Sequence, residues 1–141
     1  MLKKKLNSIL LVDDDEATIY LHKTMIEIVD CAEKIVIAEN GEEAIKLLSD
    51  KVDGEFLQPS LIFLDINMPR MNGWEFLETY KRMYPHQRAE IIIVMLTTSL
   101  NPSDRERAKE FKEVNGFMNK PITIDSLKEI LRLYFSDIIQ D

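Results

Sequence analysis

The chain has 141 residues, enough for one domain with a hydrophobic core and too few for two domains of ordinary size. Its formal net charge of -7 argues against nucleic acid or an anionic membrane as a partner, because such partners need a basic surface. The basic first residues are not followed by an apolar run long enough for a signal peptide or a membrane span, so we expect a cytoplasmic protein. The single cysteine, Cys31, is expected to be a partly buried, inert thiol.

Five short apolar runs predict buried strands, and each is followed by a segment with helical spacing. The strands are expected at 9–12, 35–38, 61–65, 91–96 and 116–119, and the helices at 15–29, 41–48, 72–84, 101–113 and 123–138. Helix N-caps are predicted at Asn40, Asn72, Asn101 and Thr123. The polar connection over 50–60 is longer than usual and is interpreted as a surface loop.

Strands that alternate with helices predict a parallel sheet with right-handed crossovers and helices on both faces. We therefore expect an α/β fold, a flavodoxin-like doubly wound sheet of five parallel strands in the order 2-1-3-4-5 with five helices.

Four of the five predicted strands end in polar side chains: Asp13 and Asp14 on the first, Asp65 on the third, Thr97 on the fourth and Lys120 on the fifth. In the predicted order these strands are neighbours, so the side chains should meet at one edge of the sheet. Two carboxylates about 4 Å apart repel each other by roughly 4 kcal/mol at an effective dielectric of 20, which favours a bound cation. Oxygen ligands beside a phosphate suit Mg²⁺. The group fits Mg²⁺-dependent phosphorylation of Asp65, with Lys120 and Thr97 holding the phosphoryl oxygens. For any single residue, a surface ion pair or a turn is also a reasonable interpretation.

The motifs at these strand ends resemble those of the receiver domain of two-component response regulators, in its stand-alone, chemotaxis-regulator-like form. They are Ile9-Leu10-Leu11-Val12-Asp13-Asp14, Leu64-Asp65-Ile66-Asn67-Met68-Pro69 with Asn72-Gly73, Leu96-Thr97, and Lys120-Pro121. The resemblance implies that Asp65 accepts phosphate from a sensor histidine kinase or a histidine phosphotransfer protein. It also implies that Asp14, Asp65 and the backbone carbonyl of Asn67 bind Mg²⁺ directly and that Asp13 acts through water. Thr97 and Lys120 would hold the phosphoryl group, and the bond before Pro121 would be cis.

The same resemblance implies a switch in which Thr97 moves and an aromatic residue on the fifth strand turns inward. Phe117 occupies the aromatic position but lacks the hydroxyl of the commoner Tyr, and an ordinary half-buried strand residue is an equal interpretation. Asn67 and Ser99 resemble the positions that tune self-dephosphorylation. Neither is a strong base, so we expect that reaction to be slow.

We expect a single receiver domain over 1–141 without an output domain, which is a signalling domain rather than an enzyme. It would dock a downstream protein target, or pass phosphate along a relay, through the face formed by 101–113, 116–119 and 123–138. Apolar residues near the end of the last helix fit either a homodimer or partner contact or core packing. They are Leu133, Phe135, Ile138 and Ile139.

Two other functions compete with this interpretation. A haloacid-dehalogenase-like phosphatase would use Asp13 as its nucleophile with Asp15 two positions on, although Ala17 stands where that motif usually has Thr. A receiver-like docking module that is never phosphorylated is the second alternative. Labelling with acetyl phosphate and Mg²⁺ separates the three, because it should mark Asp65, Asp13 or neither.

Overall fold

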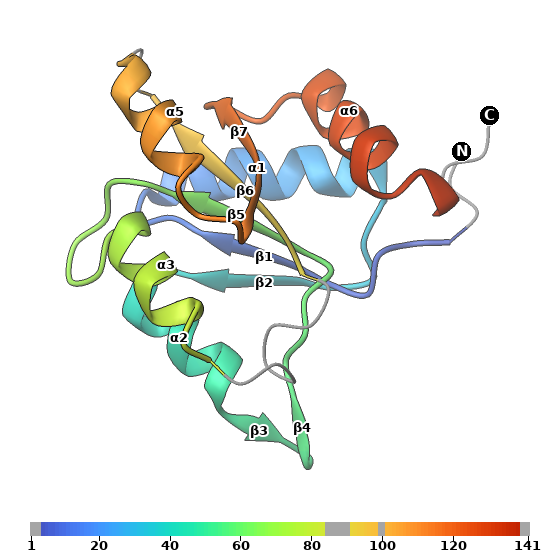
Figure 1. The fold of residues 1–141 in the computed structure, drawn as a ribbon. Coiled ribbons are helices and arrows are strands. Elements are labelled where there is room, and N and C mark those ends of the chain that lie inside the picture. Colours follow the sequence, from blue (N-terminus) through green and yellow to red (C-terminus); the bar gives the residue numbers. More distant parts are fainter. Residues whose placement is uncertain (1–3, 84–90, 99–100, 139–141) are drawn as a thin grey trace.

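A five-stranded parallel sheet forms the centre of the computed structural model, which describes residues 4–83, 91–98 and 101–138 (Figure 1). Its strands are β1 (Ile9–Val12), β2 (Ile35–Ala38), β5 (Leu61–Asp65), β6 (Ile92–Thr97) and β7 (Val114–Asn119). They lie in the order β2-β1-β5-β6-β7 and every pair is parallel. Because β5, β6 and β7 are the third, fourth and fifth strands of this sheet along the chain, the predicted order 2-1-3-4-5 is confirmed.

Helices cover both faces of the sheet (Figure 1). One face packs against α1 (Glu16–Val29) and α6 (Ile124–Tyr134), and the other against α2 (Gly41–Ser49) and α3 (Gly73–Tyr80). The short helix α5 (Pro102–Ala108) lies beside β7 and contributes Ala108 to the second face. The described residues therefore contain the five α-helices that were predicted, in a flavodoxin-like arrangement, and a 3-10 helix over Ser136–Ile138.

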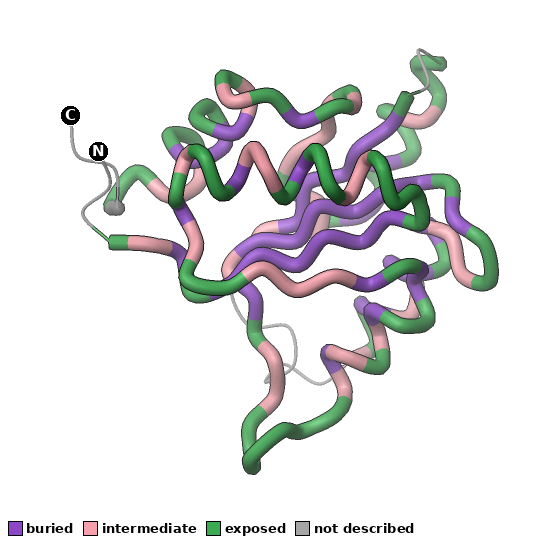
Figure 2. Tube along the Cα trace, turned by 180° about the vertical axis from the view of Figure 1, so that it is seen from behind, coloured by how far each residue is buried: buried purple, intermediate pink, exposed green. Residues whose placement is uncertain are grey.

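The strand residues divide between two hydrophobic cores. In β1, Ile9 and Leu11 face the core under α1 and α6, whereas Leu10 and Val12 face the core under α2 and α3. All the residues of β1 and β5 are buried, and Figure 2 shows the buried segments running together through the middle of the molecule. A strand that is enclosed on both faces carries apolar side chains along its length, so its polar side chains are found where the strand ends. The chemistry of this fold is therefore placed at the edge where the strands stop.

All four predicted N-caps are confirmed, because each side chain accepts a hydrogen bond from a backbone N–H of its helix. Asn72 forms a full capping box with Glu75, whose carboxylate accepts from the N–H of Asn72 at 3.0 Å. Asp15 caps α1 in the same way. These local bonds satisfy N–H groups that the helix itself leaves unpaired, so helix starts are well determined by nearby sequence.

Helix ends were predicted less well. The third helix was expected to reach Tyr84, but α3 ends at Tyr80 and two tighter turns follow, in which Arg82 and Met83 donate to carbonyls three residues back. Tyr84 and Pro85 lie outside the described residues. The helix expected over 101–113 ends at Ala108, again in i to i+3 turns. Those turns bring the ring of Phe111 onto Trp74, with centroids 6.1 Å apart.

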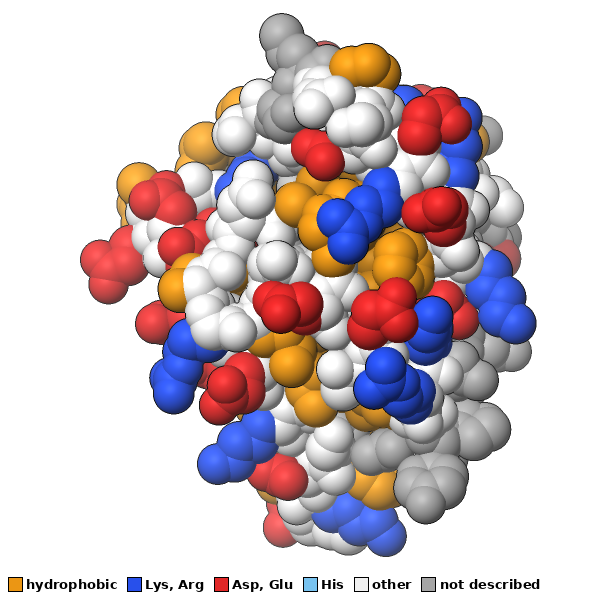
Figure 3. Space-filling view, turned by 60° about the vertical axis from the view of Figure 1, so that its left-hand side comes forward, with side chains coloured by type: hydrophobic (Ala, Val, Ile, Leu, Met, Phe, Trp, Pro, Cys, Tyr) orange, Lys and Arg blue, Asp and Glu red, His pale blue; other side chains and the backbone are white. Residues whose placement is uncertain are grey.

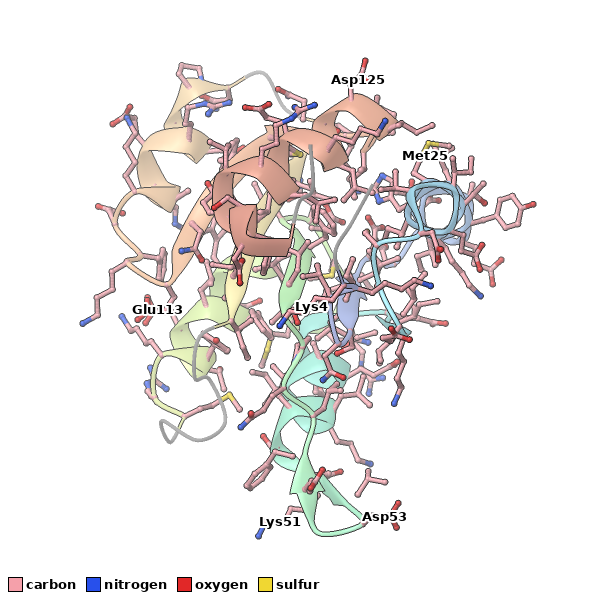
Figure 4. All side chains as sticks on the ribbon, turned by 90° about the vertical axis from the view of Figure 1, so that its right-hand side faces the viewer. Lys4, Met25, Lys51, Asp53, Glu113 and Asp125 are labelled. Atoms are coloured by element: carbon pink, nitrogen blue, oxygen red, sulfur yellow. The ribbon has the colours of Figure 1, made fainter. Side chains whose placement is uncertain are left out.

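The connection over 50–60, predicted as a surface loop, is exposed at 51–55 but contains a short hairpin. Strands β3 (Lys51–Val52) and β4 (Glu55–Phe56) form an antiparallel hairpin with its turn at Asp53 and Gly54. Both turn residues have positive φ, which Gly and Asp tolerate. Figure 4 shows that this hairpin, on which Lys51 and Asp53 are labelled, projects away from the main sheet. Across the described part of the chain, the structure has no helix long and apolar enough to cross a membrane.

Candidate functional site

Three carboxylates converge where β1 and β5 end. Asp13 and Asp14 follow β1 directly, and Asp65 is the last residue of β5. The strands pair with Val12 opposite Leu64, which places these acids side by side. One oxygen from each carboxylate lies within 4.8 Å of the others. Asp13 and Asp65 are buried, whereas Asp14 is exposed. The three acids therefore form a half-buried cluster that is open to solvent on one side.

Lys120 brings one positive charge to this cluster. Its ammonium lies 2.8 Å from Oδ2 of Asp13 and 3.1 Å from Oδ1 of Asp65, and its side chain is only 11% exposed. The backbone N–H of Lys120 donates to the carbonyl of Thr97 at 2.8 Å, so the ends of β6 and β7 are joined beside the site. The predicted meeting of Asp13, Asp65 and Lys120 is thus present in the structure.

The cluster shifts the pKa of its own groups. Burial and, next, the charge of Asp13 raise the pKa of Asp65 to about 6, and Lys120 only partly opposes them. For Lys120, burial by itself would lower the pKa, but the hydrogen bond to Asp13 and the charges of Asp65 and Asp13 outweigh it and raise the pKa. One ammonium therefore does not neutralise three carboxylates, and the site attracts a further cation.

Gly73 holds the start of α3 against the end of β5. Its N–H donates to the carbonyl of Ile66 at 2.8 Å. A β-carbon at this position would lie 2.6 Å from the carbonyl oxygen of Asp65, closer than real β-carbon contacts allow. The glycine of the Asn72-Gly73 pair is thus required by close backbone approach, and it sets the backbone beside the Asp65 carboxylate.

Thr97 and Phe117 lie on the two strands next to the acidic cluster. Thr97 is the last residue of β6 and is buried. Phe117 is half-buried on β7, and the guanidinium of Arg105 on α5 lies 4.8 Å from the centre of its ring. Arg107 lies over Trp74 in the same manner, at 4.6 Å. Figure 3 shows basic side chains lying on hydrophobic ones on this side of the molecule.

The remaining predicted site residues are placed as follows. Asn67 is exposed, two residues beyond Asp65. The Lys120–Pro121 peptide bond is cis. Ser99 lies outside the described residues. The roles given to Asn67 and Ser99 stay predictions.

Two residues of this region were missed by the sequence analysis. His22 is buried on α1 and accepts a hydrogen bond from the backbone N–H of Ile122. It lies at helical spacing between Ile19 and Ile26, so a polar residue in an apolar stripe was the available signal. Arg105 carried no signal, because its contact with Phe117 depends on how α5 packs beside β7.

The donor set fits a small divalent cation. Carboxylate oxygens are the ligands that Mg²⁺ prefers, and one or two of them with water commonly complete its site. The exposed carboxylate of Asp14 leaves a side of the cluster accessible. Asp14 and Asp65 are the residues that would hold the ion, with Asp13 beside them.

Fold and site together define an α/β domain with an acidic, lysine-containing site at the carboxyl ends of its parallel strands. Residues 9–132 match the model of the response regulator receiver domain. The chain is 31% identical over 120 residues to the probable methanogenesis regulatory protein FilR2 of Methanothrix harundinacea, an alignment that covers 85% of this chain and 76% of that protein. It is 30% identical to the transcriptional regulatory protein CpxR of Escherichia coli, covering 90% of this chain but only 50% of CpxR.

Solved structures agree with this match. A two-component response regulator from Cytophaga hutchinsonii is 31% identical, with a TM-score of 0.80 over 94% of this chain and 99% of that one. The phosphorylated cyanobacterial phytochrome response regulator RcpA is 28% identical, with a TM-score of 0.75 over 94% and 96%. The Mn(2+)-bound form of response regulator Rcp1 is also 28% identical, with a TM-score of 0.69 over 95% and 97%. The chain therefore belongs to the response regulator receiver domain family.

Proposed function

We propose that Asp65 accepts a phosphoryl group in an Mg²⁺-dependent reaction from a sensor histidine kinase or a histidine phosphotransfer protein. A downstream protein target, or a further relay protein, then recognises the changed surface. The observation that carries the proposal is the bridge of Lys120 between Asp13 and Asp65 within a cluster of three carboxylates. A solvated surface cluster would not bury Asp65 or raise the pKa of its carboxyl group.

Each residue has a distinct part in this chemistry. At neutral pH the Asp65 carboxylate is ionised, because its pKa of about 6 is lower than the pH. One of its oxygens forms a bond to phosphorus while the bond from phosphorus to the donor nitrogen breaks. Lys120, already 3.1 Å from Asp65, can move its hydrogen bonds to the phosphoryl oxygens. When bound, Mg²⁺ would supply the positive charge that offsets the three acids and the phosphoryl group. The Mn(2+)-bound Rcp1 structure supports a divalent cation in this family.

The face that responds is proposed to be α5, β7 and α6. Helix α5 has Ala108 as its single buried residue, so little apolar area holds it in place. The guanidinium of Arg105 rests on Phe117, the candidate switch residue. An inward turn of Phe117 would break this contact and release Arg105 to solvent. At the end of α6, the side chain of Leu133 is 62% exposed, whereas Phe135 packs on the core. Ile139 lies outside the described residues. That these residues form a homodimer contact stays a prediction.

The test is the identity of the modified residue. Incubation with acetyl phosphate and Mg²⁺, followed by peptide mapping, should mark Asp65 and should fail when Mg²⁺ is chelated. Asp65→Asn should keep the fold and lose the label. A label on Asp13 would support a phosphatase of the haloacid-dehalogenase type, and absence of any label would support an unphosphorylated docking module. Normal labelling of Asp65→Asn would contradict the assignment.

Lys120→Ala separates acceptance of phosphate from signalling. We expect this variant still to be phosphorylated at Asp65, although more slowly than wild type, and to show a much smaller change in affinity for its target on phosphorylation. An unaltered affinity change would count against Lys120 as the residue that reads the phosphoryl group. We also predict that the receiver acts without an output domain. The mass of the native polypeptide tests this prediction.

A further inference from the structure

Helix α1 carries a histidine on its buried face. His22 is 2% exposed, and Ile19 and Ile26 lie before and after it at helical spacing. An apolar side chain would pack equally well at such a position. Nε2 of His22 instead accepts a hydrogen bond from the backbone N–H of Ile122 at 3.0 Å. The ring therefore joins α1 to the connection between β7 and α6, two residues beyond Lys120.

The N–H of Ile122 needs an acceptor of this kind. Ile122 lies between the end of β7 at Asn119 and the N-cap of α6 at Thr123, so its N–H belongs neither to the strand pairing nor to the helix. Ile122 is 1% exposed, which excludes water as a ready partner. A buried backbone N–H without an acceptor is costly. Hydrogen bonding, rather than packing, accounts for the histidine.

The connection that carries Lys120 is thereby held on both sides. On one side the N–H of Lys120 donates to the carbonyl of Thr97 at 2.8 Å. On the other side Ile122 is bound to His22, and the intervening Pro121 has a restricted φ. The backbone at Lys120 has little freedom left, so its ammonium is presented at 2.8 Å from Asp13 and 3.1 Å from Asp65.

The His22 ring accepts this hydrogen bond from Ile122 without adding charge to the site. Because Ile122 donates to Nε2, that nitrogen carries no proton and the ring is neutral with its proton on Nδ1. Burial lowers the pKa of His22 to about 4, in agreement with a neutral ring. A charged ring would be attracted by Asp13 and repelled by the ammonium of Lys120.

We propose that His22 is a positioning residue for Lys120, which holds the Ile122 amide so that the ammonium stays where it can receive the phosphoryl oxygens. This inference rests on the phosphoryl-acceptor function proposed above. Three substitutions distinguish it from simple packing. His22→Leu keeps the apolar volume and removes the acceptor. His22→Gln can place its amide oxygen near the position of Nε2, whereas His22→Asn has an acceptor that is too short to reach.

Two measurements on the full chain test the proposal. The first is the rate of Asp65 labelling by acetyl phosphate and Mg²⁺, which we expect to fall by roughly three- to tenfold in His22→Leu and His22→Asn, because small misplacements of a charged group slow transfer. The second is the NMR signal of the Lys120 ammonium, which is slow to exchange when its hydrogen bonds are held. Both should return towards wild type in His22→Gln.

The outcomes separate this inference from the proposed function. If His22→Leu loses stability but labels at the wild-type rate with an unchanged Lys120 signal, His22 is only structural and the inference fails. If wild type is not labelled, the proposed function fails, and the Lys120 signal alone decides the positioning. Should the variants not fold, the scalar coupling between Ile122 N and His22 Nε2 in wild type must be present; its absence would overturn the inference.

Discussion

Replacing Asp65 with Asn should make the metal-free protein more stable, although it removes the proposed reactive group. Asn keeps the shape of Asp65 and removes its charge from a cluster that holds three carboxylates and one ammonium. Burial and Asp13 raise the pKa of Asp65 from its ordinary 3.8 to about 6. That difference corresponds to about 3 kcal/mol, because one pKa unit equals about 1.4 kcal/mol. We therefore expect Asp65→Asn to raise the free energy of unfolding at pH 7 by about 2–3 kcal/mol.

The gain should depend on pH with a definite sign. Between pH 3.8 and about 6 the folded protein binds the Asp65 proton more tightly than the unfolded chain does. The stability of wild type therefore falls as the pH rises through this window. The advantage of Asp65→Asn should be near zero at pH 3.5 and complete above about pH 6.5, since Asn has no proton to lose.

Urea denaturation in the presence of a chelator, at several pH values, measures this gain. The dependence of the unfolding free energy on urea concentration should be the same in both proteins, because the surface exposed on unfolding does not change. Asp53→Asn, in the turn of the exposed hairpin, is the matched control and should change stability by less than about 0.5 kcal/mol. A loss of stability in Asp65→Asn at pH 7, or a gain that is equally large at pH 3.5, would refute the electrostatic argument.

Three further predictions follow from the same structure. Adding Mg²⁺ at 100 times its dissociation constant should stabilise wild type by about 2.7 kcal/mol and Asp65→Asn by clearly less, as thermal unfolding would reveal. Ser8 is 1% exposed and its hydroxyl has no hydrogen-bond partner within the described structure; Ser8→Ala should leave the free energy of unfolding unchanged or raise it by up to about 1 kcal/mol, and a clear loss in denaturant titration would point to a hidden partner. Burial raises the pKa of Cys31 to about 11, so a thiol reagent at pH 8 should modify it much faster in urea than in the native protein, and equal rates would contradict its burial.

Local signals account for the parts of the fold that were predicted well. The caps at Asn40, Asn72, Asn101 and Thr123 bond to N–H groups two or three residues away, so neighbouring residues suffice to identify them. Helix ends had no comparable signal. The early ends of α3 and α5 accompany the stacking of Trp74 on Phe111, a contact between segments far apart in the chain. The hairpin at Lys51–Phe56 was missed because its strands are too short to show alternation.

By itself, the sequence determined where the five strands lie and which of them end in acids, a threonine or a lysine, because hydrophobicity and turn residues act over a few positions. From these it could predict that Asp13, Asp65 and Lys120 would meet. Only the tertiary structure decided that Lys120 bridges the two acids and that His22 holds the connection behind it. Both contacts join atoms of residues more than 50 positions apart in the chain. The distances between such atoms are set by how helices pack on the sheet rather than by any local sequence pattern.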